Sequence, residues 1–166
     1  QIVGRLSRDV AKKHHHEDPA LYMDLVRRGV VLRIMGGTCL KPRLTGVPSI
    51  ELLPSCAQEA SAFLASLDVF FYRTSTTMTE GFGRVVVEAM ACGLPVVCEE
   101  RGGYLSLLEH GRNALLFEPG ENPVDLLMKL CTDRPLRERI GNAARETVTS
   151  IYSKKWREEL AAFYCC

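Results

Sequence analysis

The sequence lacks any apolar run long enough to cross a bilayer, and it lacks a secretory signal segment. It also has no internal repeat, no low-complexity segment and almost no net charge, since the formal charge at pH 7 is +1. These absences exclude a membrane-spanning protein and any global electrostatic attraction to nucleic acid or anionic lipid. We therefore expect a soluble, cytoplasmic protein, and we leave open a peripheral contact with a membrane.

No pair of cysteines has the C-x-x-C spacing of a zinc site, although the chain contains seven cysteines. The seven are scattered, and several fall in apolar stretches, so we expect reduced thiols rather than disulfides. Three consecutive histidines, His14 to His16, point in different directions on an extended chain and are unsuited to holding one metal ion. We expect neither a metal nor a cofactor.

The length and composition are those of one globular domain, with 166 residues of which 46% are hydrophobic and 25% charged. The chain starts at Gln1 rather than Met and enters a strand-like stretch at once. We therefore expect residues 1–166 to be a single domain of a longer, two-domain protein.

Six short apolar stretches alternate with amphipathic ones, which is typical of parallel strands joined by helices. The expected strands are 2–3, 30–35, 50–53, 69–72, 95–98 and 114–117, and the expected helices are 18–28, 58–67, 84–92, 104–109, 123–130, 135–151 and 153–164, with 41–48 as a loop. Right-handed crossovers turn this order into a Rossmann-like α/β/α sandwich with a six-stranded parallel sheet. The loops at the carboxyl edge of the sheet hold Arg5, Gly36, Pro54, Glu80 and Gly102.

The stretch from Thr79 to Glu100, TEGFGRVVVEAMACGLPVVCEE, is the part most indicative of function. A helix that starts after a glycine-flanked turn presents free amides and the positive end of its dipole, which together bind phosphate. Glu88 stands roughly 7 Å along that helix, close to the distance between a diphosphate and a ribose. Because Glu88 interrupts an apolar run, we expect it to be buried and partnered rather than a solvated charge.

A basic loop follows the first strand, and its cations are candidates for pairing with a diphosphate or are simply solvated. They are Arg5, Arg8, Lys12 and Lys13. The glycine pair at 36–37 lacks the G-x-x-x-x-G-K-[ST] pattern, which argues against ATP hydrolysis at that turn.

Several motifs occur together and in order along nearly the whole chain. They are Gly4-Arg5-Leu6-Ser7 with a following lysine, Asp68 to Phe71 leading into Glu80-Gly81-Phe82-Gly83, the E-x7-E spacing of Glu80 and Glu88, the stretch EAMACGLPVV at 88–97, Gly102-Gly103, and HGRN at 110–113. In this combination the chain resembles the carboxyl-terminal domain of retaining GT-B glycosyltransferases of family 4, glycosyltransferase group 1.

The resemblance implies the donor-binding half of a retaining hexosyltransferase of glycan biosynthesis, which uses a nucleotide diphosphate sugar without a bound metal. It implies catalytic roles for Arg5 and for Lys13 or Lys12 at the diphosphate and for Glu80 at the donor sugar. It places Glu88 at the ribose and the base near Leu53 and Pro54. The remaining donor-binding positions that it implies are Gly4, Gly81, Phe82, Gly83, Arg84 and Val85.

The acceptor site would then belong to an amino-terminal domain, toward which the helix at 153–164 crosses. On this interpretation the chain alone does not transfer sugar. Two alternatives stay open, a nucleotide-sugar isomerase or epimerase of the same double-Rossmann plan and a non-catalytic partner module. The base, UDP, GDP or ADP, is not fixed by the sequence.

Overall fold

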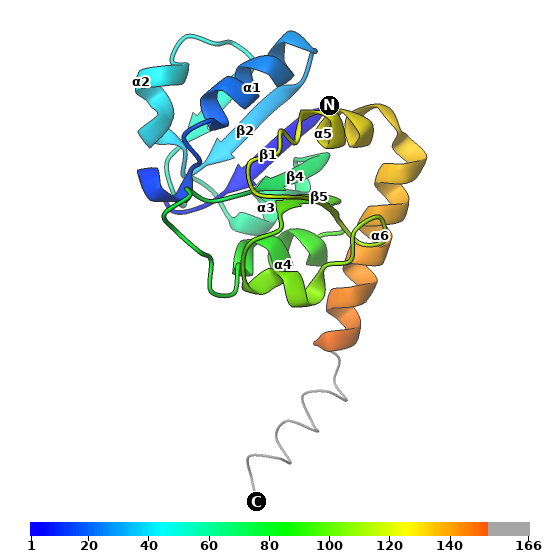
Figure 1. The fold of residues 1–166 in the computed structure, drawn as a ribbon. Helices are drawn as coiled ribbons and strands as arrows, with labels where there is room; N and C mark the ends of the chain where they lie inside the picture. The colour runs from blue at the N-terminus through cyan, green and yellow to red at the C-terminus, as the bar shows by residue number, and fades with distance from the viewer. Residues whose placement is uncertain (153–166) are drawn as a thin grey trace, which may run out of the picture.

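A single sheet of six parallel strands runs through the centre of the molecule, as seen in the computed structural model, which describes residues 1–152 (Figure 1). The strands are β1 (Ile2–Leu6), β2 (Val31–Met35), β3 (Ile50–Leu53), β4 (Val69–Tyr72), β5 (Val96–Glu99) and β6 (Leu115–Phe117). Their order is β3-β2-β1-β4-β5-β6, and every neighbouring pair is parallel. The predicted Rossmann-like sheet is therefore confirmed. The expected helix at 153–164 lies outside the described residues.

Helices cover both faces of the sheet and enclose one hydrophobic cluster on each side (Figure 1). They are α1 (Asp18–Arg27), α2 (Lys41–Leu44), α3 (Ala60–Ala65), α4 (Arg84–Ala91), α5 (Val124–Thr132) and α6 (Arg134–Ile151). Successive residues of β4 point to opposite sides, so that Phe71 packs with α1 and α5 while Phe70 packs with α3 and α4. Burial on both sides explains why β4 and β6 are apolar throughout.

The sheet reverses its strand order between β1 and β4, because the chain adds β2 and β3 on one side of β1 and β4 to β6 on the other. In such sheets the loops at the carboxyl ends diverge at the reversal and leave a crevice. The loop after β1 includes the 3-10 turn η1 (Ala11–Lys13), and the loop after β4 runs to the start of α4.

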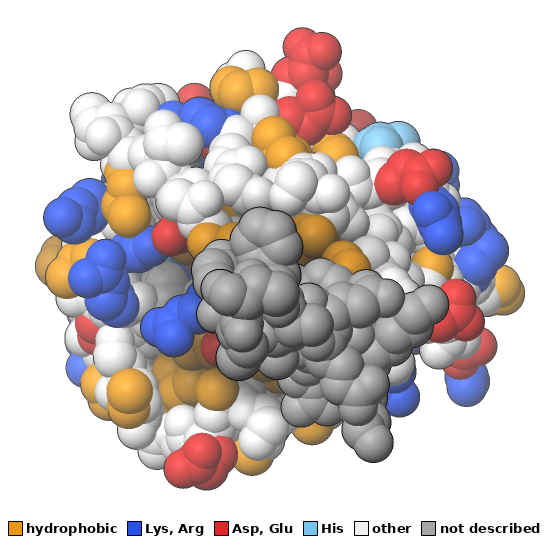
Figure 2. Space-filling view, turned by 90° about the horizontal axis from the view of Figure 1, so that it is seen from below, with side chains coloured by type: hydrophobic (Ala, Val, Ile, Leu, Met, Phe, Trp, Pro, Cys, Tyr) orange, Lys and Arg blue, Asp and Glu red, His pale blue; other side chains and the backbone are white. Residues whose placement is uncertain are grey.

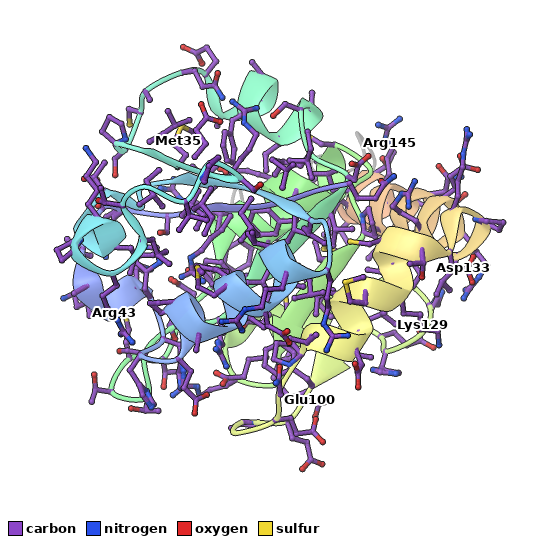
Figure 3. The ribbon with its side chains drawn as sticks, turned by 90° about the horizontal axis from the view of Figure 1, so that it is seen from above. Met35, Arg43, Glu100, Lys129, Asp133 and Arg145 are labelled. Atoms are coloured by element: carbon purple, nitrogen blue, oxygen red, sulfur yellow. The ribbon has the colours of Figure 1, made fainter. Side chains whose placement is uncertain are left out.

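The last described helix, α6, begins at a clear signal and then packs across α4. Asp133 accepts a hydrogen bond from the Leu136 amide at 2.9 Å, and Pro135 occupies the first turn, where its missing N–H costs nothing. Further along, Arg145 Nη2 donates to the Cys92 carbonyl at 2.8 Å and so satisfies the carboxyl end of α4 (Figure 3).

Three expected elements differ from the structure. The stretch expected as a loop at 41–48 starts with α2, preceded by the 3-10 turn η2 (Thr38–Leu40), because Pro42 is tolerated in a first helical turn. The helix expected at 58–67 is the shorter α3, and the one expected at 104–109 is the 3-10 helix η3 (Gly103–Leu107). The other boundaries agree to within a few residues.

Acidic and basic side chains are interspersed on the face shown in Figure 2, without a broad area of one sign. That distribution agrees with the formal net charge of +1. An anion bound by this protein must therefore be held by a local arrangement of groups rather than by the field of the whole molecule.

Candidate functional site

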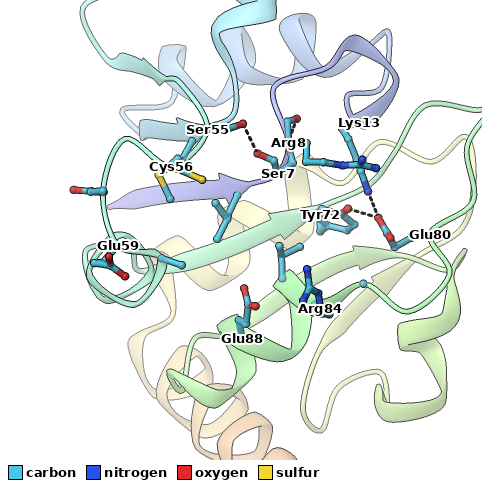
Figure 4. Close-up of a pocket in the computed structure, with 16 residues that line it drawn as sticks. Ser7, Arg8, Lys13, Ser55, Cys56, Glu59, Tyr72, Glu80, Arg84 and Glu88 are labelled. Carbon is cyan, nitrogen blue, oxygen red and sulfur yellow. Dashed lines mark hydrogen bonds and ion pairs between the residues drawn. The ribbon is translucent and has the colours of Figure 1, made fainter.

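A cavity of about 730 Å³ opens where the strand order reverses (Figure 4). Its floor includes the last residues of three strands, Leu6, Met35 and Tyr72. Its walls come from the loops after β1, β3 and β4 and from the start of α4, and they comprise Ser7, Arg8, Lys13, Ser55, Cys56, Gln58, Glu59, Ala60, Glu80, Gly83, Arg84, Val85 and Glu88. Segments far apart in the sequence thus meet at one edge of the sheet.

The amino terminus of α4 forms one wall of this cavity. Gly83 precedes the helix with φ of 73°, a left-handed conformation that glycine adopts without strain, and a Cβ there would lie 2.5 Å from the Tyr104 ring. Across the described residues, no side chain caps the first turn of α4. Because Arg84 and Val85 line the cavity, the free amides of that turn and the positive end of the helix dipole are available to an anion there.

Two side chains from other parts of the chain hold Glu80 at the cavity wall (Figure 4). Tyr72 Oη donates to Glu80 Oε2 at 2.7 Å, and Lys13 Nζ forms an ion pair with the same oxygen. Burial raises the pKa of Glu80, but the hydrogen bonds from Lys13 and Tyr72 outweigh that effect and hold the pKa below its ordinary value. Glu80 is therefore a carboxylate at neutral pH. Burial raises the pKa of Tyr72, which keeps its hydroxyl protonated as the donor.

The two candidate lysines of the basic loop lie in different surroundings. The turn η1 directs Lys13 inward, where it is 6% exposed and lines the cavity, whereas Lys12 is exposed and is not among the lining residues. Arg8, from the same loop, is exposed and does line the cavity. The structure therefore brings Lys13 and Arg8 to the site and leaves Lys12 outside it.

Arg5 is buried and does not line the cavity, although the sequence led us to expect it at a diphosphate. Its side chain is 1% exposed. The guanidinium lies 3.8 Å from the Asp18 carboxylate, donates from Nη2 to the Lys13 carbonyl, and sits 4.9 Å from the centre of the Tyr72 ring. The Arg5 side chain is thus held in a buried position by an acidic partner, a carbonyl and the face of the Tyr72 ring.

Glu88 lines the cavity, but it is exposed, which corrects the expectation that it is buried among apolar groups (Figure 4). The helical period explains the difference. Val86, Ala89 and Met90 face the sheet, while Arg84 and Glu88, four residues apart, share the side that faces the cavity. Val86, Val87, Ala89 and Met90 are therefore buried on other sides of α4, while Val85 lines the cavity together with Glu88.

The cavity residues near β3 lie in the loop after the strand, two or more positions beyond the expected Leu53. Leu53 and Pro54 do not line it, and the Leu53 carbonyl is taken by the amides of Gly36 and Gly37 at 2.9 and 3.1 Å. The residues that do line this end are Ser55, Cys56, Gln58, Glu59 and Ala60. The sequence analysis did not assign these five to the site, nor Ser7 and the strand-end residues Leu6, Met35 and Tyr72. Their positions at the end of a strand or after it were the available signal.

Of the three glycines expected at the site, Gly83 lines the cavity, whereas Gly4 and Gly81 do not. Gly4 lies inside β1, where a Cβ would meet the Leu67 side chain at 2.3 Å, so its role is close packing under the sheet. Gly81 and Phe82 are exposed and do not line the cavity, and Phe82 is 46% exposed. Gly83 is the one that borders it.

Residues 1–152 contain no group of three or more His, Cys, Asp or Glu side chains arranged to hold a metal ion. His14 is buried, with Nε2 at 2.8 Å from the Gly36 carbonyl, and burial lowers the pKa of His14 to about 4.

No helix within residues 1–152 has the length and apolar character to cross a membrane.

The geometry defines a class of Rossmann-like domain in which a helix amino terminus, basic side chains and carboxylates line one cavity at the strand-order reversal. Residues 48–147, more than half of the chain, match the glycosyl transferases group 1 family. The chain therefore belongs to this family, and its fold is that of the carboxyl-terminal domain of a GT-B glycosyltransferase.

Among its relatives, the chain is 39% identical over 112 residues to the sulfoquinovosyl transferase SQD2 of Arabidopsis thaliana, an alignment covering 64% of this chain and 21% of SQD2. It superposes with a TM-score of 0.80 on HepE of Anabaena in complex with UDP and glucose, at 24% identity, over 99% of this chain and 48% of HepE. It also matches the carboxyl-terminal domain of the group 1 protein LpcC from Francisella tularensis, with a TM-score of 0.71 and 20% identity, over 92% and 86% of the two chains.

The chain spans less than half the length of the first curated relatives it matches, between 21% and 45%. Its similarity to the LpcC domain, by contrast, covers most of both chains. The comparison thus aligns this chain with one domain of longer proteins.

Proposed function

We propose that this chain binds the nucleotide diphosphate sugar donor in a two-domain retaining glycosyltransferase. The observation that supports this proposal best is one cavity bordered by the amino terminus of α4, by Lys13 and by Glu80 and Glu88. Such a set offers a phosphate site, a counter-charge and two carboxylates that accept hydrogen bonds from hydroxyl groups.

The diphosphate lies at the start of α4 in this proposal. The amides of the first turn donate to its oxygens, and Lys13 and Arg8 supply positive charge from the opposite wall. Lys13 is paired with Glu80, so the diphosphate shares or replaces that partner when it binds.

The nucleoside extends from the diphosphate along α4 toward the loop after β3. Glu88, one helical turn beyond Arg84, accepts hydrogen bonds from the ribose hydroxyls. The base lies near Leu53 and Pro54, against the side chains of Ser55 to Glu59 that line this end. HepE, which shares the fold, is described in complex with UDP and glucose, and this supports a uridine nucleotide as the first candidate.

Glu80 contacts the donor sugar, on the other side of the diphosphate from the nucleoside. Transfer with retention then follows a front-face displacement. The bond between the sugar C1 and the diphosphate oxygen breaks, a bond from C1 to the acceptor oxygen forms on the same face, and the departing phosphate takes the acceptor proton. Lys13 and the α4 amides stabilise the charge that develops on the leaving diphosphate.

The acceptor and the residues that bind it belong to the remainder of the protein in this proposal. The chain alone therefore binds donor nucleotide without transferring sugar. Sugar transfer by the isolated chain, measured with a labelled donor, would contradict this part of the proposal.

The direct test is a calorimetric titration of the chain with UDP, GDP and ADP, repeated on Glu88→Ala. We expect one nucleotide to bind and the substitution to weaken it about tenfold or more, because two ribose hydrogen bonds to a carboxylate are lost. Glu100→Ala is the matched control, since Glu100 is exposed and does not line the cavity. Binding that is unaffected by Glu88→Ala, or absent for all three nucleotides, would contradict the proposed site.

A further inference from the structure

A buried group of charged side chains, formed by Arg5, Asp18 and Arg73, lies next to Lys13 and Tyr72 of the cavity lining. Asp18 is 0% exposed and accepts a hydrogen bond from Arg73 Nε at 2.7 Å, with Arg5 Nη1 at 3.8 Å from its other oxygen. The three residues come from β1, from the start of α1 and from the position directly after β4. Burying such charges costs free energy that their mutual attraction only partly offsets.

The Arg5 guanidinium is incompletely satisfied in this position. Its Nε and Nη1 groups are among the buried polar atoms without a hydrogen-bond partner in the described part of the chain, together with the Tyr22 hydroxyl and His14 Nδ1. An arrangement that leaves buried donors unpaired is not the one that stability alone favours. The burial of Arg5 in this arrangement therefore indicates a functional role.

The contacts of Arg5 lead to both of the side chains that hold Glu80. Its Nη2 donates to the Lys13 carbonyl, which fixes the backbone from which the Lys13 ammonium reaches Glu80. Its planar face lies 4.9 Å from the centre of the Tyr72 ring, whose hydroxyl donates to the same carboxylate. The buried guanidinium of Arg5 thus contacts both residues, Lys13 and Tyr72, whose side chains bind the Glu80 carboxylate.

We propose that Asp18 and Arg5 form a positioning pair, which acts through Lys13 and Tyr72 to set the Glu80 carboxylate and the Lys13 ammonium at the cavity wall. Asp18 fixes the orientation of Arg5, and Arg5 fixes the positions of Lys13 and Tyr72. The proposal rests on the proposed function for its consequence in donor binding. It assigns Arg5 an indirect role at the diphosphate and gives Asp18 a role that the sequence motifs do not.

The arrangement has a measurable signature in the absence of any ligand. The side chains that lower the pKa of Glu80 are Lys13 and Tyr72, with a further contribution from the charge of Arg8. If the pair positions Lys13 and Tyr72, Asp18→Asn raises the pKa of Glu80 toward its ordinary value, although Asp18 does not touch Glu80. A substitution that acted only on overall stability would leave the pKa of Glu80 in the folded protein unchanged.

The first arm of the test follows the Glu80 carboxyl carbon by NMR through an acid titration, with Glu80→Gln identifying its signal. We expect the pKa to rise in Asp18→Asn and to stay at the native value in Asp24→Asn, the control on the same helix, whose side chain pairs with Arg28. In a Lys13→Gln, Tyr72→Phe background, Asp18→Asn should add no further rise. A native pKa in folded Asp18→Asn would overturn the proposal.

Arg5→Lys serves as the second variant if Asp18→Asn does not fold. It keeps a positive charge beside Asp18 but loses the planar fork that reaches the Lys13 carbonyl and covers the Tyr72 ring. The same rise in the pKa of Glu80 is expected. An unchanged pKa in this variant would also overturn the proposal.

The second arm compares UDP with uridine by calorimetry. Asp18→Asn should weaken UDP binding about tenfold and leave uridine binding within twofold, because Lys13 serves only the diphosphate. In the Lys13→Gln background the loss on adding Asp18→Asn should vanish; a persisting loss would mean that Arg5 acts on the diphosphate directly and would overturn the positioning role. If the native chain binds no nucleotide, the proposed function fails, and the NMR arm still decides the positioning pair.

Discussion

At the scale of single residues, the cavity combines partners that the chain brings from separate loops. Glu80 follows β4, Lys13 follows β1, and Tyr72 ends β4, yet all three meet at one carboxylate oxygen. Lys12, the immediate neighbour of Lys13, is exposed and faces away from this group. Two adjacent and chemically identical residues therefore have different positions relative to the site.

That difference gives a matched pair of substitutions. Lys13→Gln should weaken the binding of UDP about tenfold, since a cation that serves the diphosphate is removed. Lys12→Gln should change it less than twofold, because its side chain does not line the cavity. Calorimetry with both variants measures the two effects under the same conditions, and equal losses would show that the turn at η1 does not select between the lysines.

At the scale of elements, α4 both packs in the hydrophobic core and borders the cavity. One side packs on the sheet and on α6, while its first turn and its Arg84–Glu88 side border the cavity. Its carboxyl end is held by α6, where Gly141 lies so close that a Cβ would be 2.2 Å from the Gly93 carbonyl oxygen. The position of the cavity wall thus depends on a helix that is remote from the site.

Gly141→Ala should consequently destabilise the domain by about 1–3 kcal/mol, because backbone must move to admit the methyl group. Asn142→Ala, at an exposed position next along α6, is the control and should change stability by less than about 0.5 kcal/mol. Urea denaturation followed by circular dichroism gives both values. A Gly141→Ala variant as stable as the native chain would mean that α6 can withdraw from α4 without cost.

Sequence reasoning succeeded at this scale where the pattern is local. The run of four apolar residues in β4 predicts a buried strand, which the structure has, and the start of α4 follows from the glycine turn before it. It failed where a side chain's surroundings are set by distant residues. The exposure of Glu88 depends on which side of α4 meets the sheet, and the inward turn of Arg5 depends on Asp18 and Tyr72.

At the scale of the whole molecule, the buried polar groups beneath the cavity link its stability to pH. Burial lowers the pKa of His14 to about 4, with the positive charge of Arg5 contributing, so His14 is neutral in the folded protein near neutral pH. In the unfolded chain a histidine titrates at about 6.5. Between these values the unfolded chain takes up a proton that the folded protein does not, so falling pH favours unfolding.

The stability that His14 contributes is therefore fully present above about pH 6.5 and is lost as the pH falls toward 4. The whole difference amounts to about 3 kcal/mol, and thermal unfolding across this range measures it. His14→Gln should make the profile less steep, since glutamine does not titrate but can still donate to the Gly36 carbonyl. His16→Gln, at an exposed position in the same run of histidines, should keep the native slope; a His14→Gln profile as steep as the native one would contradict the assignment.

The ion pair between Lys13 and Glu80 also affects how nucleotide binding responds to salt. Because Glu80 compensates the charge of the Lys13 ammonium, this lysine exerts little long-range attraction on a diphosphate. In the native chain the dependence of nucleotide binding on ionic strength should therefore come mainly from the exposed Arg8. Removing the negative partner, as in Glu80→Gln, would convert the same lysine into an open charge whose attraction for the nucleotide falls steeply as salt is added.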